Sequence, residues 1–174
     1  MSDMNSVVPS VIPPNPGAPS DVNQEALALE TKKMHLRSII KGGAGWFYWI
    51  AGLTLINTIM AMSGSSSRFV NGLMITAVVD YFASSLPFVG KFAAVTLDGL
   101  GIALFIFFGV FANRMKGWAF LAGFIVFTLD SILSLLTFSP ITIIFHGIAL
   151  WSIFNGYRKL KELQVLEPVP MQGF

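Results

Sequence analysis

Five polar side chains in apolar surroundings are the residues of this chain that could carry chemistry. They are three carboxylates, one imidazole and one amide: Asp80, Asp98, Asp130, His146 and Asn57. Carboxylate and imidazole groups bind divalent metals, relay protons or coordinate cations. Ionisable residues inside membrane segments are rare and suggest a functional site by default. The sequence therefore predicts a polar intramembrane cluster, with Asp98, Asp130 and His146 as candidate metal ligands.

The same five residues also suit a purely structural role. An Asp can hydrogen-bond to a neighbouring helix and fix its register, each such bond contributing about 0.6 kcal/mol on average. No two of the candidate ligands share a helix at a metal-binding spacing such as His-x-x-x-His. A single His on an apolar helix could instead ligate a porphyrin-type pigment. The cluster is thus either an ion site or a hydrogen-bond lock, and the sequence identifies no cofactor.

The elements that must position these residues are membrane spans. Only 11% of the 174 residues are charged and 54% are hydrophobic, whereas about a quarter of a soluble domain is charged. The mean hydropathy is +0.70. About 20 apolar residues cross a bilayer, and four runs approach or reach that length: 43–62, 92–112, 118–138 and 141–157. The predicted fold class is an all-α integral membrane four-helix bundle.

The Lys and Arg residues predict the topology. If the four runs span and the more polar run 69–90 does not, nine cations lie on one side and two, Arg68 and Lys91, on the other. If 69–90 also spans, the division is five against six. Cytoplasmic loops hold the excess of Lys and Arg. We therefore expect both termini in the cytoplasm, and 69–90 as an interfacial or re-entrant helix at the outer face.

The remaining segments flank this membrane domain, 42–157. Residues 1–20 hold five of the nine prolines and predict a flexible tail. Residues 21–41 predict an amphipathic helix on the cytoplasmic membrane surface, and 158–174 form a cytoplasmic C-terminal tail. The cations expected to contact lipid headgroups are Lys32, Lys33, Arg37 and Lys41.

Helical spacing places small and polar residues beside each ionisable group. The three predicted faces are Gly123, Phe127, Asp130, Ser134 and Thr137; Thr142, His146 and Ala149; and Ala94, Asp98 and Gly101. Faces of this kind point into a bundle and away from lipid. In the predicted topology the polar residues lie about 8–12 Å below the outer boundary. We expect them to converge in one cavity there, with Asp80 capping it.

A resemblance to a group of proteins indicates the membrane in which the chain is expected to lie. The run Gly45-Trp46-Phe47-Tyr48-Trp49-Ile50-Ala51-Gly52-Leu53, continued by Ile56-Asn57 and followed in order by Asp80, Asp98, Asp130 and His146, resembles a group of small uncharacterised bacterial multi-pass membrane proteins. The resemblance covers residues 43–157. It implies the bacterial inner (plasma) membrane and no particular activity.

Three functions fit these features. The first is a non-catalytic accessory or scaffold subunit of a larger membrane complex, which the short loops and the tail favour. The alternative is a small cation- or proton-handling transport protein that uses the outer-half Asp/His cluster. The third is an intramembrane metal-dependent enzyme or a pigment-binding protein. Expected partners are the lipid bilayer and other membrane subunits or further copies of this chain. Nucleic acid is not expected, because the net charge is only +2 and the cations lie where topology requires them.

Overall fold

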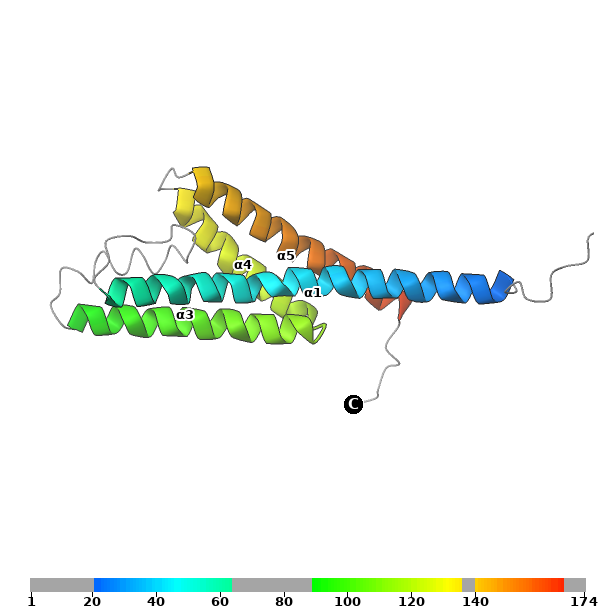
Figure 1. Ribbon diagram of the computed structural model, residues 1–174, viewed down its shortest axis with the longest axis horizontal. Helices are drawn as coiled ribbons and strands as arrows, with labels where there is room; N and C mark the ends of the chain where they lie inside the picture. Colours follow the sequence, from blue (N-terminus) through cyan, green and yellow to red (C-terminus); the bar gives the residue numbers. More distant parts are fainter. Residues whose placement is uncertain (1–20, 64–88, 136–139, 168–174) are drawn as a thin grey trace, which may run out of the picture. The chain divides into compact units, whose positions relative to one another are not determined.

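The computed structural model describes residues 21–63, 89–135 and 140–167. These residues form four helices: α1 (Asp21–Met62), α3 (Val89–Asn113), α4 (Gly117–Ser134) and α5 (Pro140–Leu166) (Figure 1). No strand occurs within the described ranges, so the predicted all-α class is confirmed for them. The Pro-rich tail 1–20, the run 69–88 and Asp80 lie outside the described residues.

α1 is one continuous helix where the sequence predicts two separate elements. α1 includes both the predicted surface helix 21–41 and the predicted span 43–62. The chain divides into two compact units after Lys32, within this helix. In the first unit, the described side chains of residues 23–32 are all exposed. The second unit contains the rest of α1 together with α3, α4 and α5.

An aromatic core joins α1 to α3 and α4. The ring of Phe47 is fully buried, and its centroid lies 6.1–6.2 Å from the ring centroids of Phe105, Phe108 and Phe120. Gly123 makes room for this ring, because a Cβ atom there would collide with Phe47 Cε1. Aromatic pairs in such arrangements contribute about 0.5–1.5 kcal/mol beyond their burial. Phe47 therefore fixes how α1 sits against its two neighbours.

Two glycines bring α1 and α5 into backbone contact. A Cβ atom on Gly43 would lie 2.8 Å from the carbonyl oxygen of Ser152 and 2.9 Å from Cα of Gly156. A Cβ atom on Gly156 would lie 3.1 Å from Cα of Gly43. Small residues permit such close approach between membrane helices. The glycine-rich stretch is thus a helix crossing, which explains why it does not interrupt α1.

An ion pair joins α1 to Glu167, the residue directly after α5. Arg37 Nη2 donates to both carboxylate oxygens of Glu167, at 2.8 and 3.1 Å, and Lys33 Nζ lies 3.8 Å from Oε1. Leu160 and Leu163 continue the buried face of α5 toward this pair. The helix therefore extends well beyond the predicted span end at residue 157, because its apolar stripe outlasts the strongly hydrophobic run.

A tight turn, 113–117, connects α3 to α4. The N–H groups of Lys116 and Met115 donate to the carbonyls of Phe111 and Ala112, at 3.1 and 3.0 Å. This is a Schellman arrangement, in which glycine is usual at the left-handed position. Met115 occupies that position with φ 60°, and its side chain packs against the core cluster.

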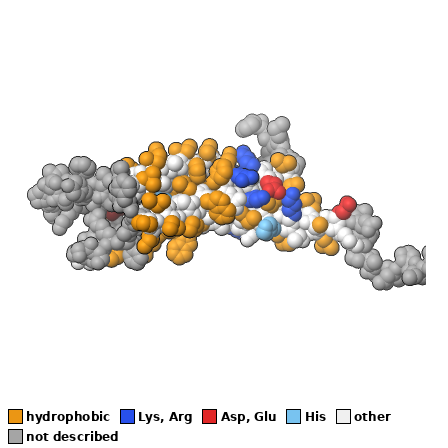
Figure 2. All heavy atoms as spheres, turned by 90° about the horizontal axis from the view of Figure 1, so that it is seen from above, with side chains coloured by type: hydrophobic (Ala, Val, Ile, Leu, Met, Phe, Trp, Pro, Cys, Tyr) orange, Lys and Arg blue, Asp and Glu red, His pale blue; other side chains and the backbone are white. Residues whose placement is uncertain are grey.

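Three helical segments are long and apolar enough to cross a membrane: Asn23–Met60, Val95–Asn113 and Gly117–Ser134. Figure 2 shows hydrophobic side chains covering the visible face of the helices, with the visible Lys and Arg gathered at one end of that apolar band. α5 contains the fourth predicted span, 141–157, and begins at Pro140, a residue type that is favoured at the first position of a helix.

Candidate functional site

The buried faces of α4 and α5 carry the polar residues that the sequence singles out. On α4 the buried positions include Gly123, Phe127, Asp130 and Ser134, and on α5 they include Thr142, His146 and Ala149. These sets match the predicted faces, apart from Thr137, which lies outside the described residues. Because α4 packs against α5, the helical periodicity of each chain segment points Asp130 and His146 into the same interface.

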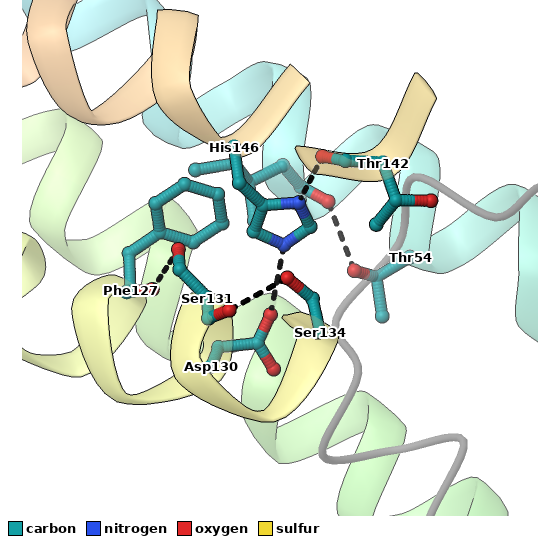
Figure 3. A network of polar contacts seen from close by, with 8 residues as sticks. Thr54, Phe127, Asp130, Ser131, Ser134, Thr142 and His146 are labelled. Atoms are coloured by element: carbon teal, nitrogen blue, oxygen red, sulfur yellow. Dashed lines mark hydrogen bonds and ion pairs between the residues drawn. The ribbon is translucent and has the colours of Figure 1, made fainter. Parts of the chain in front are cut away.

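Asp130 and His146 form a buried pair (Figure 3). Nε2 of His146 lies 3.3 Å from Oδ2 of Asp130, and both side chains are only 3% exposed. The other ring nitrogen, Nδ1, lies 2.8 Å from the carbonyl oxygen of Thr142, one turn earlier on α5. Both nitrogens of the imidazole are therefore engaged by the protein.

The carbonyl partner determines how the imidazole is protonated at one nitrogen. A carbonyl oxygen only accepts, so Nδ1 carries a hydrogen and donates it to Thr142. The contact between Nε2 and Oδ2 then contains one hydrogen. This hydrogen is bonded either to Nε2, which gives an imidazolium and a carboxylate, or to Oδ2, which gives a neutral imidazole and a carboxylic acid. Both arrangements give the pair a net charge of zero. A neutral pair avoids the cost of placing a lone charge in an apolar interior.

An aromatic ring and three hydroxyl side chains surround the Asp130–His146 pair. The ring of Phe127 stacks on the imidazole, with centroids 5.0 Å apart and an interplanar angle of 5°. Ser131 and Ser134 donate to backbone carbonyls of their own helix, Phe127 and Ser131, at 2.7 Å each. Thr54 of α1 does the same to Ile50 at 2.9 Å (Figure 3). These hydroxyls meet their hydrogen-bonding needs locally.

Asp98 forms a separate polar contact between α1 and α3. Its Oδ2 accepts from the hydroxyl of Thr58 at 2.6 Å, and the side chain is 5% exposed. Thr58 Oγ1 also lies 3.0 Å from the Thr54 carbonyl. The second carboxylate oxygen, Oδ1, is buried and makes no hydrogen bond within the described chain. The spacing of Thr54 and Thr58, one helical turn apart, is the sequence signal that could have identified this partner.

The predicted cluster is thus distributed over two described contacts. Asp130 pairs with His146 and Asp98 with Thr58, while Asn57 lies half-buried on α1, next to Thr58 in the sequence. Among the described residues, no group of three or more His, Asp, Glu or Cys side chains is placed to hold a metal ion. Both ring nitrogens of His146 are engaged, by the Thr142 carbonyl and by Asp130.

The predicted lipid-surface cations have two different environments. Lys33 and Arg37 contact Glu167, the residue directly after α5, a partner that the sequence did not predict. Lys32 and Lys41 have exposed side chains. The acidic end of α5 therefore occupies part of the basic surface expected to face lipid headgroups.

Together these observations define a helical protein whose described part contains three segments able to cross a membrane and whose buried polar groups contact one another between helices. Comparisons with protein-family models, curated proteins and solved structures gave no match.

Proposed function

We propose that this chain is a non-catalytic accessory or scaffold subunit of a larger complex in the bacterial inner membrane. One observation carries the proposal: both nitrogens of His146 are engaged within the buried Asp130–His146 contact. A polar pair of this kind joins helices and presents no open ligand position. The extensive exposed apolar faces, including Trp118, Ile125 and Trp151, provide surface for lipid and for partner subunits.

The proposed topology has four spans and cytoplasmic termini. Contacts at both ends of one helix pair support it, because Thr58 meets Asp98 and Tyr48 meets Asn113. α1 and α3 are therefore antiparallel neighbours, and the segment between them starts and returns at the same side. The Arg37–Glu167 contact brings residue 37 of α1 close to the end of α5, which supports a common side for these two segments. Both features favour an even number of crossings, with 69–90 at the outer face.

Reporter fusions test this topology. A cytoplasm-active reporter fused after Lys116 should give a signal, and the same reporter after Gly90 should give none. The Lys116 position is the described α3–α4 turn, so its fusion preserves both preceding helices. A signal from the Gly90 fusion, or silence from the Lys116 fusion, would contradict the four-span proposal.

The subunit role is tested by extraction in a mild detergent followed by native mass analysis. We expect the chain to remain bound to one or more larger membrane proteins at fixed stoichiometry. Migration as a monomer or a homo-oligomer alone, under conditions that keep known complexes of the same membrane intact, would count against the role. A chain with Thr96→Val serves as a matched control, since this exposed hydroxyl donates to the Phe92 carbonyl of its own helix and has no other hydrogen bond among the described residues.

A second candidate is cation or proton transport, and a specific observation favours it. Asp98 has a buried carboxylate oxygen without a hydrogen bond in the described chain, and such an oxygen can accept a proton or a cation. If this role is correct, liposomes containing the protein should conduct protons or cations, and Asp98→Asn should abolish the flux. Thr96→Val, on the same helix, should leave it unchanged. Flux that persists in Asp98→Asn would exclude this role for the carboxylate.

A further inference from the structure

The α3–α4 turn and the adjacent part of α5 carry a group of cations that no described acidic side chain neutralises. We call these four residues the turn patch: Arg114, Lys116, Arg158 and Lys161. All four side chains are exposed, and none makes an ion pair within the described part of the chain. By contrast, Lys159 binds Glu162 at 2.9 Å, and Arg37 binds Glu167 at 2.8 Å. Glu162 of α5 and Glu167, directly after it, are thus paired with other cations.

The two elements of the turn patch lie against each other. A Cβ atom on Gly117 would lie 3.7 Å from both Tyr157 Cε2 and Leu160 Cδ2, so the turn is in van der Waals range of α5. Lys161 Nζ lies 5.7 Å from the centroid of the Tyr157 ring. Lys116 precedes Gly117 in the sequence and so belongs to the turn that packs on this tyrosine. Cations from two segments that are distant in the sequence are therefore carried by elements that meet at Tyr157.

Aromatic side chains indicate the depth of this patch. Trp118 is half-exposed and packs on Phe107 and Phe111, with ring centroids 5.8 and 5.2 Å apart. The guanidinium carbon of Arg114 lies 5.7 Å from the Phe111 ring centroid. Trp and Tyr concentrate at the membrane–water interface, at the level of the lipid headgroups. Cations beside them are at the depth of the lipid phosphates.

We propose that the turn patch binds the phosphate of an anionic phospholipid from the cytoplasmic leaflet. Charge complementarity selects this occupant: uncompensated positive charges at headgroup depth attract anionic lipids, while Tyr157 and Trp118 contact the interfacial part of the same molecule. The patch differs from the surface that the sequence predicts at Lys33 and Arg37, which contact Glu167 instead. Assignment to the cytoplasmic leaflet rests on the proposed topology, which the Lys116 reporter fusion tests independently.

Native mass spectrometry of the full-length, delipidated protein tests the proposal. The protein is presented with equimolar phosphatidylglycerol and phosphatidylcholine, and the ratio of the two bound lipids is measured. The double variant Lys116→Gln/Lys161→Gln should lower the preference for phosphatidylglycerol about 25-fold, or about five-fold for each cation removed. The control Lys159→Gln removes one cation, which Glu162 already binds at 2.9 Å, and should retain the preference of the parent protein.

Each outcome decides the proposal. Loss of the preference in the turn-patch variant alone supports the site. A loss of about five-fold in the Lys159→Gln control, the same for each cation removed, shows attraction by overall charge and overturns it. An unchanged ratio in the turn-patch variant also overturns it. Lys116 and Lys161 are exposed and Lys159 is only partly buried, so both variants should unfold at the temperature of the parent protein, and this measurement separates lost binding from lost structure.

Discussion

Replacing Gly43 with alanine is expected to destabilise the protein by about 1–3 kcal/mol, the usual cost of overpacking a filled site. The added methyl group would meet the Ser152 carbonyl oxygen at 2.8 Å and Gly156 Cα at 2.9 Å. Both are backbone atoms of α5, so relief requires the two helices to separate. The free energy of unfolding of the purified protein in mixed micelles is the measurement. Gly156→Ala should act in the same direction, since it meets Gly43 and Phe120.

The same stretch of α1 supplies the control. A Cβ atom on Gly42 or Gly45 has nothing within 4 Å. Alanine at either position should therefore be neutral or stabilising, by up to about 1 kcal/mol, because it favours the helix more than glycine does. Opposite signs for neighbouring glycines would establish the crossing with α5. Equal effects at Gly42 and Gly43 would show that helix propensity dominates and that the crossing is not tight.

Substituting His146 by leucine is expected to destabilise the protein by about 2 kcal/mol, because it removes the imidazole from a buried carboxyl group. The two groups lie 3.3 Å apart and are each 3% exposed, so solvent cannot replace the lost contact. The double variant Asp130→Leu/His146→Leu should recover most of the loss, since exchanging both members of a buried polar pair for apolar residues is often neutral. Unfolding in mixed micelles again provides the measurement.

Comparing the two single variants with the double variant also separates a structural role of the Asp130–His146 pair from a functional one. If the Asp130–His146 contact locks α4 to α5, the double variant is more stable than the sum of the single effects predicts. Strict additivity of Asp130→Leu and His146→Leu would mean that the two side chains are not coupled. Assembly into a larger complex should survive in the double variant, because the exposed faces of both helices are unchanged.

Much of the fold is predictable from this sequence because periodicity and hydrophobicity act locally. The spacing of Phe127, Asp130 and Ser134 identifies the buried face of α4, and that of Thr142 and His146 identifies the buried face of α5. Both depend only on the 3.6-residue helical repeat. Placing Asp130 opposite His146 then follows from two antiparallel helices joined by a short connection.

The remaining features depend on contacts between distant segments. The sequence predicts two separate elements that meet near Gly42, but α1 continues through this position without ending. Packing of Gly43 on α5 compensates for the low helix propensity of glycine. The partner of Asp98 was not predicted either. Which side chain of α1 meets it depends on how that helix is rotated, and the aromatic core around Phe47 sets this rotation. The ion pair of Arg37 with Glu167 could not be predicted without knowing how far α5 extends.

The contact between Arg37 and Glu167 has a consequence for biosynthesis. The two residues are 130 positions apart, and ribosomes add about 5–20 residues per second, so roughly 7–26 s separate their synthesis. Throughout this interval the glycine face of α1 has no α5 to pack against. The nascent first helix must persist in the membrane on the strength of its own hydrogen bonds and its contacts with α3 and α4. α1 is therefore the first of the described helices to be synthesised, and its contacts with α5 are among the last to form.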